Sequence, residues 1–157
     1  VPLTMNYADC TPLFFYDPAR KVCALSHGGW RGTAGDIAGK TVSLMVERFH
    51  SRREDILGAI GPAIGLMDFE VGKEVIDAMR PLFSREEWPS LFREKGNGKY
   101  LFGLAEANHC LMRKAGLLEE HIEDCHISTW THNDFFYSYR KEKGRTGRHM
   151  AVLMMEP

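Results

Sequence analysis

A cysteine precedes and a histidine follows a predicted β-hairpin near the start of the chain. Residues 12–17 and 21–26 have strand character, and Asp17-Pro18 between them is a turn signal. Cys10 precedes the first strand and His27 follows the second, so antiparallel pairing brings their side chains to the same end of one ribbon. Three interpretations follow: a metal-binding pair, a nucleophilic Cys–His dyad, or a buried cysteine beside a structural histidine.

The residues around this pair are polar and rich in glycine. Asp9 adjoins Cys10, where it could orient His27, act as a proton carrier or cap a turn. Glycines on both sides of Trp30 and Arg31 let the backbone turn tightly. Arg31 suits a phosphate or carboxylate that it would bind through two hydrogen bonds, and a surface ion pair is the alternative.

The elements that must position these residues mix hairpins with strand–helix units. Apolar residues recur at helical spacing in residues 33–50, 68–83 and 100–115. The first of these helices starts beside the His27–Arg31 loop, so we expect its N–H groups and positive dipole end to form an anion site. Further strands are expected at residues 1–7, 56–60, 122–128, 135–140 and 149–155, with surface structure at 84–99. This order predicts an α+β sandwich with a mixed sheet.

Two late segments have ambiguous roles. The aromatic residues of 135–140 are expected mostly in the core, with one exposed ring able to stack on a flat base. Arg140, Arg145 and Arg148, with two lysines, form a basic patch whose simplest interpretation is a solvated turn.

Composition limits the class of protein. The chain has 157 residues, the size of one ordinary domain, and its net charge of −1 gives no field that favours nucleic acid or an anionic membrane. No apolar run approaches the ~20 residues that span a bilayer, and no signal peptide is visible. The four cysteines lack CxxC spacing, so free thiols and a cytoplasmic location are expected. The chain begins Val-Pro-Leu-Thr, which suggests that upstream sequence is absent.

Five motifs, in order, resemble one known family. The chain is similar to the YfiH-type family, long labelled multicopper polyphenol oxidase or laccase-domain proteins. Its members are now described as purine nucleoside phosphorylases with adenosine deaminase and methylthioadenosine phosphorylase activities. The motifs are Ala8-Asp9-Cys10-Thr11-Pro12, His27-Gly28-Gly29-Trp30-Arg31-Gly32, Gly61-Pro62-Ala63-Ile64-Gly65, Phe69-Glu70-Val71-Gly72, and Phe135-Phe136-Tyr137-Ser138-Tyr139-Arg140 with Thr146-Gly147-Arg148.

The resemblance implies a fold and a metal site. The fold would be the YfiH-type (cysteine-hydrolase-like) mixed-sheet α/β sandwich, as one domain over residues 1–157. In the family one Cys and two His hold a metal, usually zinc with copper as the alternative, and Cys10 and His27 match two of these ligands. The remaining histidine lies in an upstream motif that this chain lacks, so we expect an N-terminally truncated fragment.

The resemblance also implies partners and roles. Asp9, Cys10, His27 and Arg31 would be catalytic, and Arg31, Arg140 and Arg148 would bind substrate or phosphate. The expected substrates are purine nucleosides and phosphate, handled by a monomer or homodimer. The alternatives are a copper-dependent polyphenol oxidase, an amidase that attacks peptidoglycan precursors with Cys10, and a non-catalytic interaction module.

Overall fold

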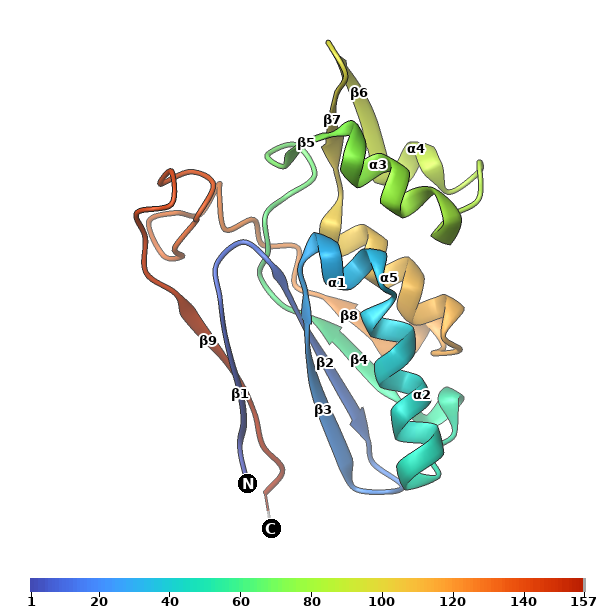
Figure 1. Ribbon diagram of the computed structural model, residues 1–157. Helices are drawn as coiled ribbons and strands as arrows, with labels where there is room; N and C mark the ends of the chain where they lie inside the picture. Colours follow the sequence, from blue (N-terminus) through green and yellow to red (C-terminus); the bar gives the residue numbers. More distant parts are fainter. Residues whose placement is uncertain (157) are drawn as a thin grey trace.

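A four-stranded mixed sheet is the centre of the structure (Figure 1). The structure is a computed structural model that describes residues 1–156. The strands β2 (Thr11–Asp17), β3 (Val22–Gly28), β4 (Leu57–Ile60) and β8 (Ile122–Asp124) lie in the order β3-β2-β4-β8. β2 pairs antiparallel with β3 and β4, whereas β4 and β8 are parallel. The hairpin expected from the Asp17-Pro18 turn is therefore confirmed.

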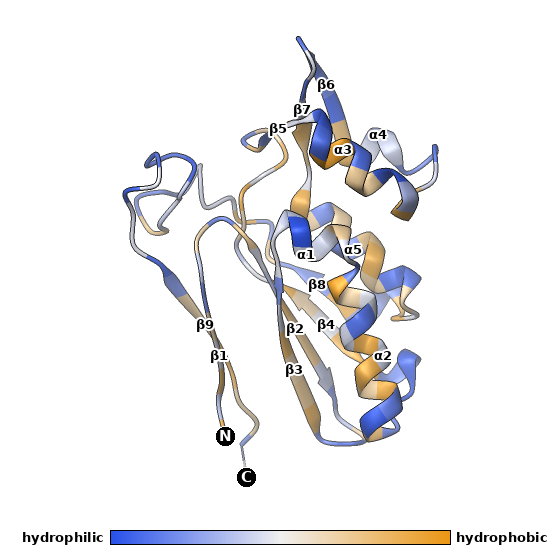
Figure 2. Ribbon diagram, viewed as in Figure 1, coloured by the Kyte–Doolittle hydropathy of each residue, from blue (hydrophilic) through white to orange (hydrophobic). Residues whose placement is uncertain are grey.

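Helices cover one face of this sheet (Figure 1). They are α1 (Trp30–Ala34), α2 (Ile37–Phe49) and α5 (Leu104–Lys114), with the short helical turn η1 (Arg53–Asp55) leading into β4. Between sheet and helices lies an apolar core that includes the fully buried Leu13, Phe15, Val42, Ile60, Leu104 and Met112. In Figure 2 much of β2, β3 and β4 and parts of α2 and α5 are coloured as hydrophobic.

The helix predicted over residues 33–50 is confirmed in part: α2 covers residues 37–49, but the first predicted residues belong to the separate α1. Asp36 adopts a left-handed backbone (φ 52°), which a continuous helix does not permit. Its side chain accepts a hydrogen bond from the backbone N–H of Gly39 at 3.0 Å and so caps the start of α2. The local hydrogen bond of Asp36 outcompetes the helical periodicity that runs through it.

A smaller three-stranded sheet carries the middle of the chain. Its strands are β5 (Glu70–Gly72), β7 (Lys99–Phe102) and β6 (Phe92–Gly96), all antiparallel, with α3 (Lys73–Met79), α4 (Trp88–Leu91) and the turn η2 (Arg80–Leu82) beside them. The helices predicted over 68–83 and 100–115 are thus correct only in part, because each begins with a strand. Residues 84–99, expected to be surface structure, contain α4 and most of the β6–β7 hairpin.

The two ends of the chain pair as a separate ribbon. β1 (Leu3–Tyr7) runs antiparallel to β9 (His149–Leu153), and Figure 1 shows both termini at its far end. β8, which follows the turn η3 (Glu119–His121), ends at Asp124, short of the strand predicted to residue 128.

The strand predicted over residues 135–140 is wrong. That segment lies within a run of turns and loops, and Phe135, Tyr137 and Tyr139 are largely exposed instead of buried. The backbone N–H groups of Phe135 and Phe136 donate to His132 O, so the turn uses donors that a strand would need. The predicted α+β architecture with a mixed sheet is confirmed. Within residues 1–156, no helix has the length and apolar character needed to cross a membrane.

Candidate active site at the end of the β2–β3 hairpin

The hairpin register brings Cys10 and His27 together. Thr11 faces Gly28 and Pro12 faces His27 across β2 and β3, and Cys10 immediately precedes β2. Between them lies Gly29, and a Cβ placed on this glycine would be 3.0 Å from Cys10 Sγ and 3.6 Å from His27 Nε2. The thiol and the imidazole therefore border one small space that exists because residue 29 has no side chain.

A pocket of about 140 Å³ opens beside Cys10. Its polar wall comes from Asp9, Cys10, Tyr139 and Arg140, which belong to the two ends of the chain. Its apolar wall comes from the helix residues Trp30 and Leu104 and the loop residues Ile64 and Phe69. Apolar walls that carry a few polar groups are typical of ligand sites.

Asp9 is buried and joins three segments. Its Oδ1 accepts a hydrogen bond from Thr129 Oγ1 at 2.7 Å, and its Oδ2 accepts one from the backbone N–H of Arg140 at 2.6 Å. Its own carbonyl accepts from the backbone N–H of Ile64 at 3.0 Å. Asp9 has a left-handed backbone (φ 74°), a conformation that Asp tolerates better than most residues. Its carboxylate thus contacts Thr129 and Arg140 through hydrogen bonds, which gives it a positioning role beside Cys10.

The three candidate arginines occupy different places. Arg140 lines the pocket, where its guanidinium carbon lies 5.1 Å from the centre of the Phe69 ring and its Nη1 donates to Glu70 O at 2.6 Å. The guanidinium of Arg148 lies 5.3 Å from the centre of the Tyr139 ring, and its charge acts on Cys10.

Arg31 is exposed and lies over the ring of Trp30 at 4.3 Å. The helix that starts beside the His27–Arg31 loop is the five-residue α1, so the long helix expected there begins only at Ile37.

Burial sets the charge states of Cys10 and His27. Burial raises the pKa of the Cys10 thiol, the Asp9 carboxylate raises it further, and Arg148 opposes both. Burial lowers the pKa of His27, so its imidazole is neutral at pH 7. A nucleophilic dyad needs a thiolate, whereas a neutral imidazole is the form that binds metals.

The donor set fits part of a metal site. Cys10 and His27 bring one sulfur and one nitrogen atom to the same small space, a pair of donor types that suits zinc or copper. Among residues 1–156, no group of three or more Cys, His, Asp or Glu side chains is arranged to hold a metal ion. The described residues therefore offer a two-ligand set.

A buried polar contact joins α5 to α1 beside the glycine-rich loop of residues 27–32. Asn108 Nδ2 on α5 donates to Thr33 Oγ1 of α1 and to Leu104 O, both at 2.9 Å. A Cβ on Gly28 would lie 3.0 Å from the same Asn108 nitrogen, so Gly28 permits this close approach. The sequence alone did not indicate this role of Asn108, nor the role of Thr129, which lies 120 residues from Asp9.

Known proteins match the chain over almost all of its length. A family model described as multi-copper polyphenol oxidoreductase laccase matches residues 1–156. Over 153 residues the chain is 40% identical to purine nucleoside phosphorylase YlmD of Geobacillus stearothermophilus, which covers 98% of this chain and 56% of that relative. A purine nucleoside phosphorylase of Bacteroides thetaiotaomicron is 34% identical over 154 residues, or 98% of this chain and 56% of the relative.

Solved structures agree with the fold. The crystal structure of the Geobacillus YlmD superposes with a TM-score of 0.92 at 40% identity, over 97% of this chain and 56% of that one. A Bacillus licheniformis protein described as hypothetical protein YfiH has a TM-score of 0.92 at 37% identity, over 96% and 56%. The chain thus spans little more than half the length of these relatives.

Proposed function

The chain belongs to the laccase-like YfiH family, and on that premise we propose that it carries the pocket of a metal-dependent purine nucleoside phosphorylase with adenosine deaminase and methylthioadenosine phosphorylase activities. The observation that supports this most is the pairing of Cys10 and His27 around Gly29, at the edge of a pocket that also contains Arg140. The names of the relatives support a phosphorylase, and the ligand chemistry supports a metal.

In phosphorolysis, phosphate forms a bond to C1′ of the nucleoside while the C1′–N9 bond breaks and the purine leaves with a proton. Arg140 would bind the phosphate at the pocket wall, with Arg148 and Arg31 adding positive charge nearby. The apolar wall that contains Trp30 and Phe69 would hold the flat purine and exclude water. Asp9 would keep Arg140 in place through its backbone N–H.

In deamination, water adds at C6 of the purine and ammonia leaves. Cys10 and His27 would hold the metal, zinc or alternatively copper, whose contribution at such a site is to lower the pKa of water. Cys10 would bind as the thiolate, and the loss of its proton would accompany metal binding. In this proposal both reactions use one pocket. The catalytic residues would be Asp9, Cys10, His27 and Arg31, and the residues that bind substrate or phosphate would be Arg31, Arg140 and Arg148.

The test combines metal analysis with turnover. We expect zinc bound by this chain, or by a fusion that adds the further segment found in the relatives, together with phosphate-dependent release of hypoxanthine from inosine. Adenosine should yield inosine in the same preparation without added phosphate. Cys10→Ser should lose both the metal and the two activities, while the matched Cys23→Ser on β3 should keep them, because Cys23 lies at the far end of the hairpin.

Other outcomes would select the alternatives. Hydrolysis of amide bonds in peptidoglycan precursors that survives chelators but is abolished by alkylation of Cys10 would indicate a thiol amidase. Oxidation of phenols with copper bound would indicate a polyphenol oxidase, the activity in the description of the matching family model. Unchanged metal content in Cys10→Ser would rule out the assigned ligand.

A further inference from the structure

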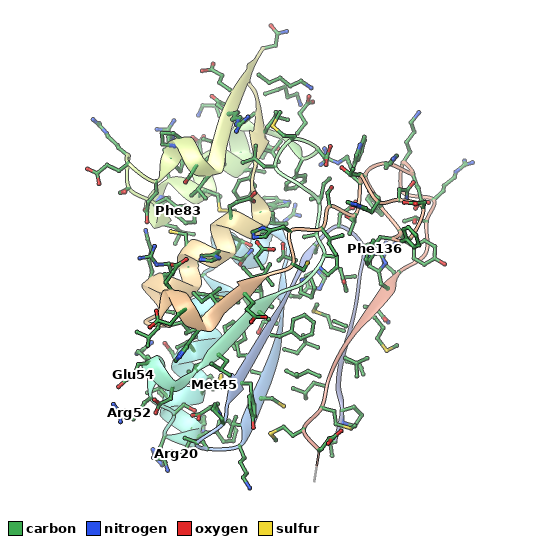
Figure 3. All side chains as sticks on the ribbon, turned by 180° about the vertical axis from the view of Figure 1, so that it is seen from behind. Arg20, Met45, Arg52, Glu54, Phe83 and Phe136 are labelled. Atoms are coloured by element: carbon green, nitrogen blue, oxygen red, sulfur yellow. The ribbon has the colours of Figure 1, made fainter. Side chains whose placement is uncertain are left out.

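A fully buried amide interrupts the apolar layer between the helices and the central sheet. Apolar side chains fill most of this layer, among them Met45 of α2, which Figure 3 labels. Asn108 of α5 is fully buried, and its Oδ1 has no hydrogen-bond partner in the part of the chain that the structure describes. An unused buried acceptor costs free energy that an apolar side chain of the same shape would not. The presence of Asn108 therefore calls for an explanation other than stability.

The amide nitrogen of Asn108 holds α1 close to α5. Asn108 Nδ2 donates to Thr33 Oγ1 and to Leu104 O, both at 2.9 Å. Thr33 is also fully buried, and its backbone N–H donates to Gly29 O at 2.8 Å. One side chain of α5 is thereby connected, through a single residue of α1, to the glycine that lies between the thiol and the imidazole of the candidate site.

Both α1 and the amide also lie directly against the backbone at the histidine. A Cβ on Gly32 of α1 would be only 2.7 Å from His27 O, and a Cβ on Gly28 would be 3.0 Å from Asn108 Nδ2. Glycine at these two positions permits the close approach. A shift of α1 relative to α5 therefore moves the glycine-rich loop relative to Cys10.

We infer that Asn108 and Thr33 are positioning residues, a role that rests on the metal site of the proposed function. Their hydrogen bond sets the separation of the Cys10 thiol and the His27 imidazole, and with it the affinity for metal. The bond holds two heavy atoms at 2.9 Å, whereas two carbon atoms attract most strongly at about 3.5–4.0 Å. Apolar side chains of the same shape would fill the space but hold α1 farther from α5, so the spacing of the pair would change.

The test replaces both members of this hydrogen bond at once. Thr33→Val and Asn108→Leu, combined in one chain, keep the shapes of the two side chains and remove their polar atoms. The thermal midpoint of the double variant should equal or exceed that of the parent, because the unused amide acceptor is gone. Its zinc affinity, measured by competition with a chromophoric chelator, should nevertheless fall about tenfold, as is usual for changes around metal ligands.

Two further variants separate positioning from packing. Thr33→Ser keeps the hydroxyl that accepts from Asn108 and should bind zinc like the parent. Met112→Ala removes a fully buried side chain one turn further along α5, beside Gly58 of β4. This variant should lower the thermal midpoint by leaving a cavity, without a change in zinc affinity.

Alkylation of Cys10 provides a second readout that needs no bound metal. Iodoacetamide is added at pH 7, and mass spectrometry gives the rate of modification at Cys10, with Cys23 as the internal reference. The double variant should react faster at Cys10, because a displaced loop uncovers the thiol. Thr33→Ser and Met112→Ala should react at the rate of the parent.

Two results would overturn the positioning role. One is a folded double variant whose zinc affinity and alkylation rate match those of the parent. The other is an equal loss of affinity in Met112→Ala, which would make the effect one of general stability. A parent chain that binds no zinc would contradict the proposed function instead, and the alkylation rates of the same variants would then confirm or overturn the role of Asn108.

Discussion

At the scale of single residues, the site depends on an atom that is missing from Gly29. Cys10 and His27 border the position where the Cβ of any other residue would lie, 3.0 Å from the sulfur and 3.5 Å from Cδ2 of the imidazole. The backbone of Gly29 (φ −72°, ψ 166°) is in the extended region that alanine adopts without strain. The requirement for glycine here is therefore one of space between the Cys10 thiol and the His27 imidazole, and conformation plays no part in it.

We expect Gly29→Ala to weaken zinc binding by at least about tenfold, a size known for changes next to metal ligands. The added methyl group pushes Cys10 Sγ away from His27, while the fold persists. Zinc affinity is measured by competition with a chromophoric chelator. The control is Gly35→Ala at the end of α1, where the nearest atom to an added Cβ is 3.4 Å away and φ is −86°. If the two variants bound zinc equally well, Gly29 would not define the site.

At the scale of elements, sequence reasoning succeeded where the determining contacts are local. The β2–β3 hairpin follows from two short strands and a turn signal. Its register alone places Cys10 at the same end of the hairpin as His27. The division of α1 from α2 could not be read from apolar spacing, because it depends on the side chain of Asp36. Alternating aromatic residues in 135–140 predict a strand, but this segment has its backbone donors engaged elsewhere, including that of Arg140 with Asp9.

The contact between α5 and the turn before α4 carries a pH-dependent part of the stability. Burial alone would raise the pKa of Glu87, but hydrogen bonds from Lys114 Nζ (2.7 Å), Cys110 Sγ (3.0 Å) and the Ser84 backbone N–H (2.7 Å) lower it from 4.5 to about 2. A carboxyl group whose pKa is lower in the folded state stabilises the fold fully above pH 4.5. That stabilisation is lost as the pH falls from 4.5 towards 2.

Glu87→Gln should therefore be less stable than the parent chain at pH 7, and the difference should shrink as the pH falls from 4.5 towards 2. Urea denaturation across this range measures the free energy of unfolding. Glu47→Gln, at an exposed position of α2, provides the control and should follow the pH dependence of the parent. A difference between Glu87→Gln and the parent that stays constant with pH would mean that the carboxylate contributes no charge-dependent stability.

At the scale of the whole molecule, the site joins segments from both ends of the chain. Cys10, His27 and Gly29 lie within 20 residues of one another, which is why their proximity could be predicted from the sequence. Thr129 and the backbone of Arg140 reach the same pocket only through the tertiary fold, and no local pattern in the sequence indicates them. The fold class was predictable for a related reason, since the order of strands and helices limits the architecture, whereas the packing of the β1–β9 ribbon depends on distant pairing.

Asp9 links the loop at Cys10 to Thr129 and Arg140, so its substitution should affect residues far along the sequence. Asp9→Asn keeps the size but replaces one acceptor oxygen by an NH₂ group. Either the Thr129 hydroxyl or the Arg140 N–H then faces a weaker or repulsive partner in a buried place. We expect a loss of about 1–3 kcal/mol in the free energy of unfolding.

The same substitution should increase hydrogen exchange at the backbone N–H of Arg140 and through residues 129–140, which mass spectrometry can localise. Asp134→Asn lies in the same segment but is exposed, and it should change neither quantity. If Asp9→Asn lowered stability without affecting exchange in residues 129–140, the carboxylate would act only on its own turn. Faster exchange confined to 129–140, by contrast, is the result expected if one buried carboxylate connects the Cys10 loop to the segment that carries Arg140, because only that segment loses a hydrogen bond from its own backbone.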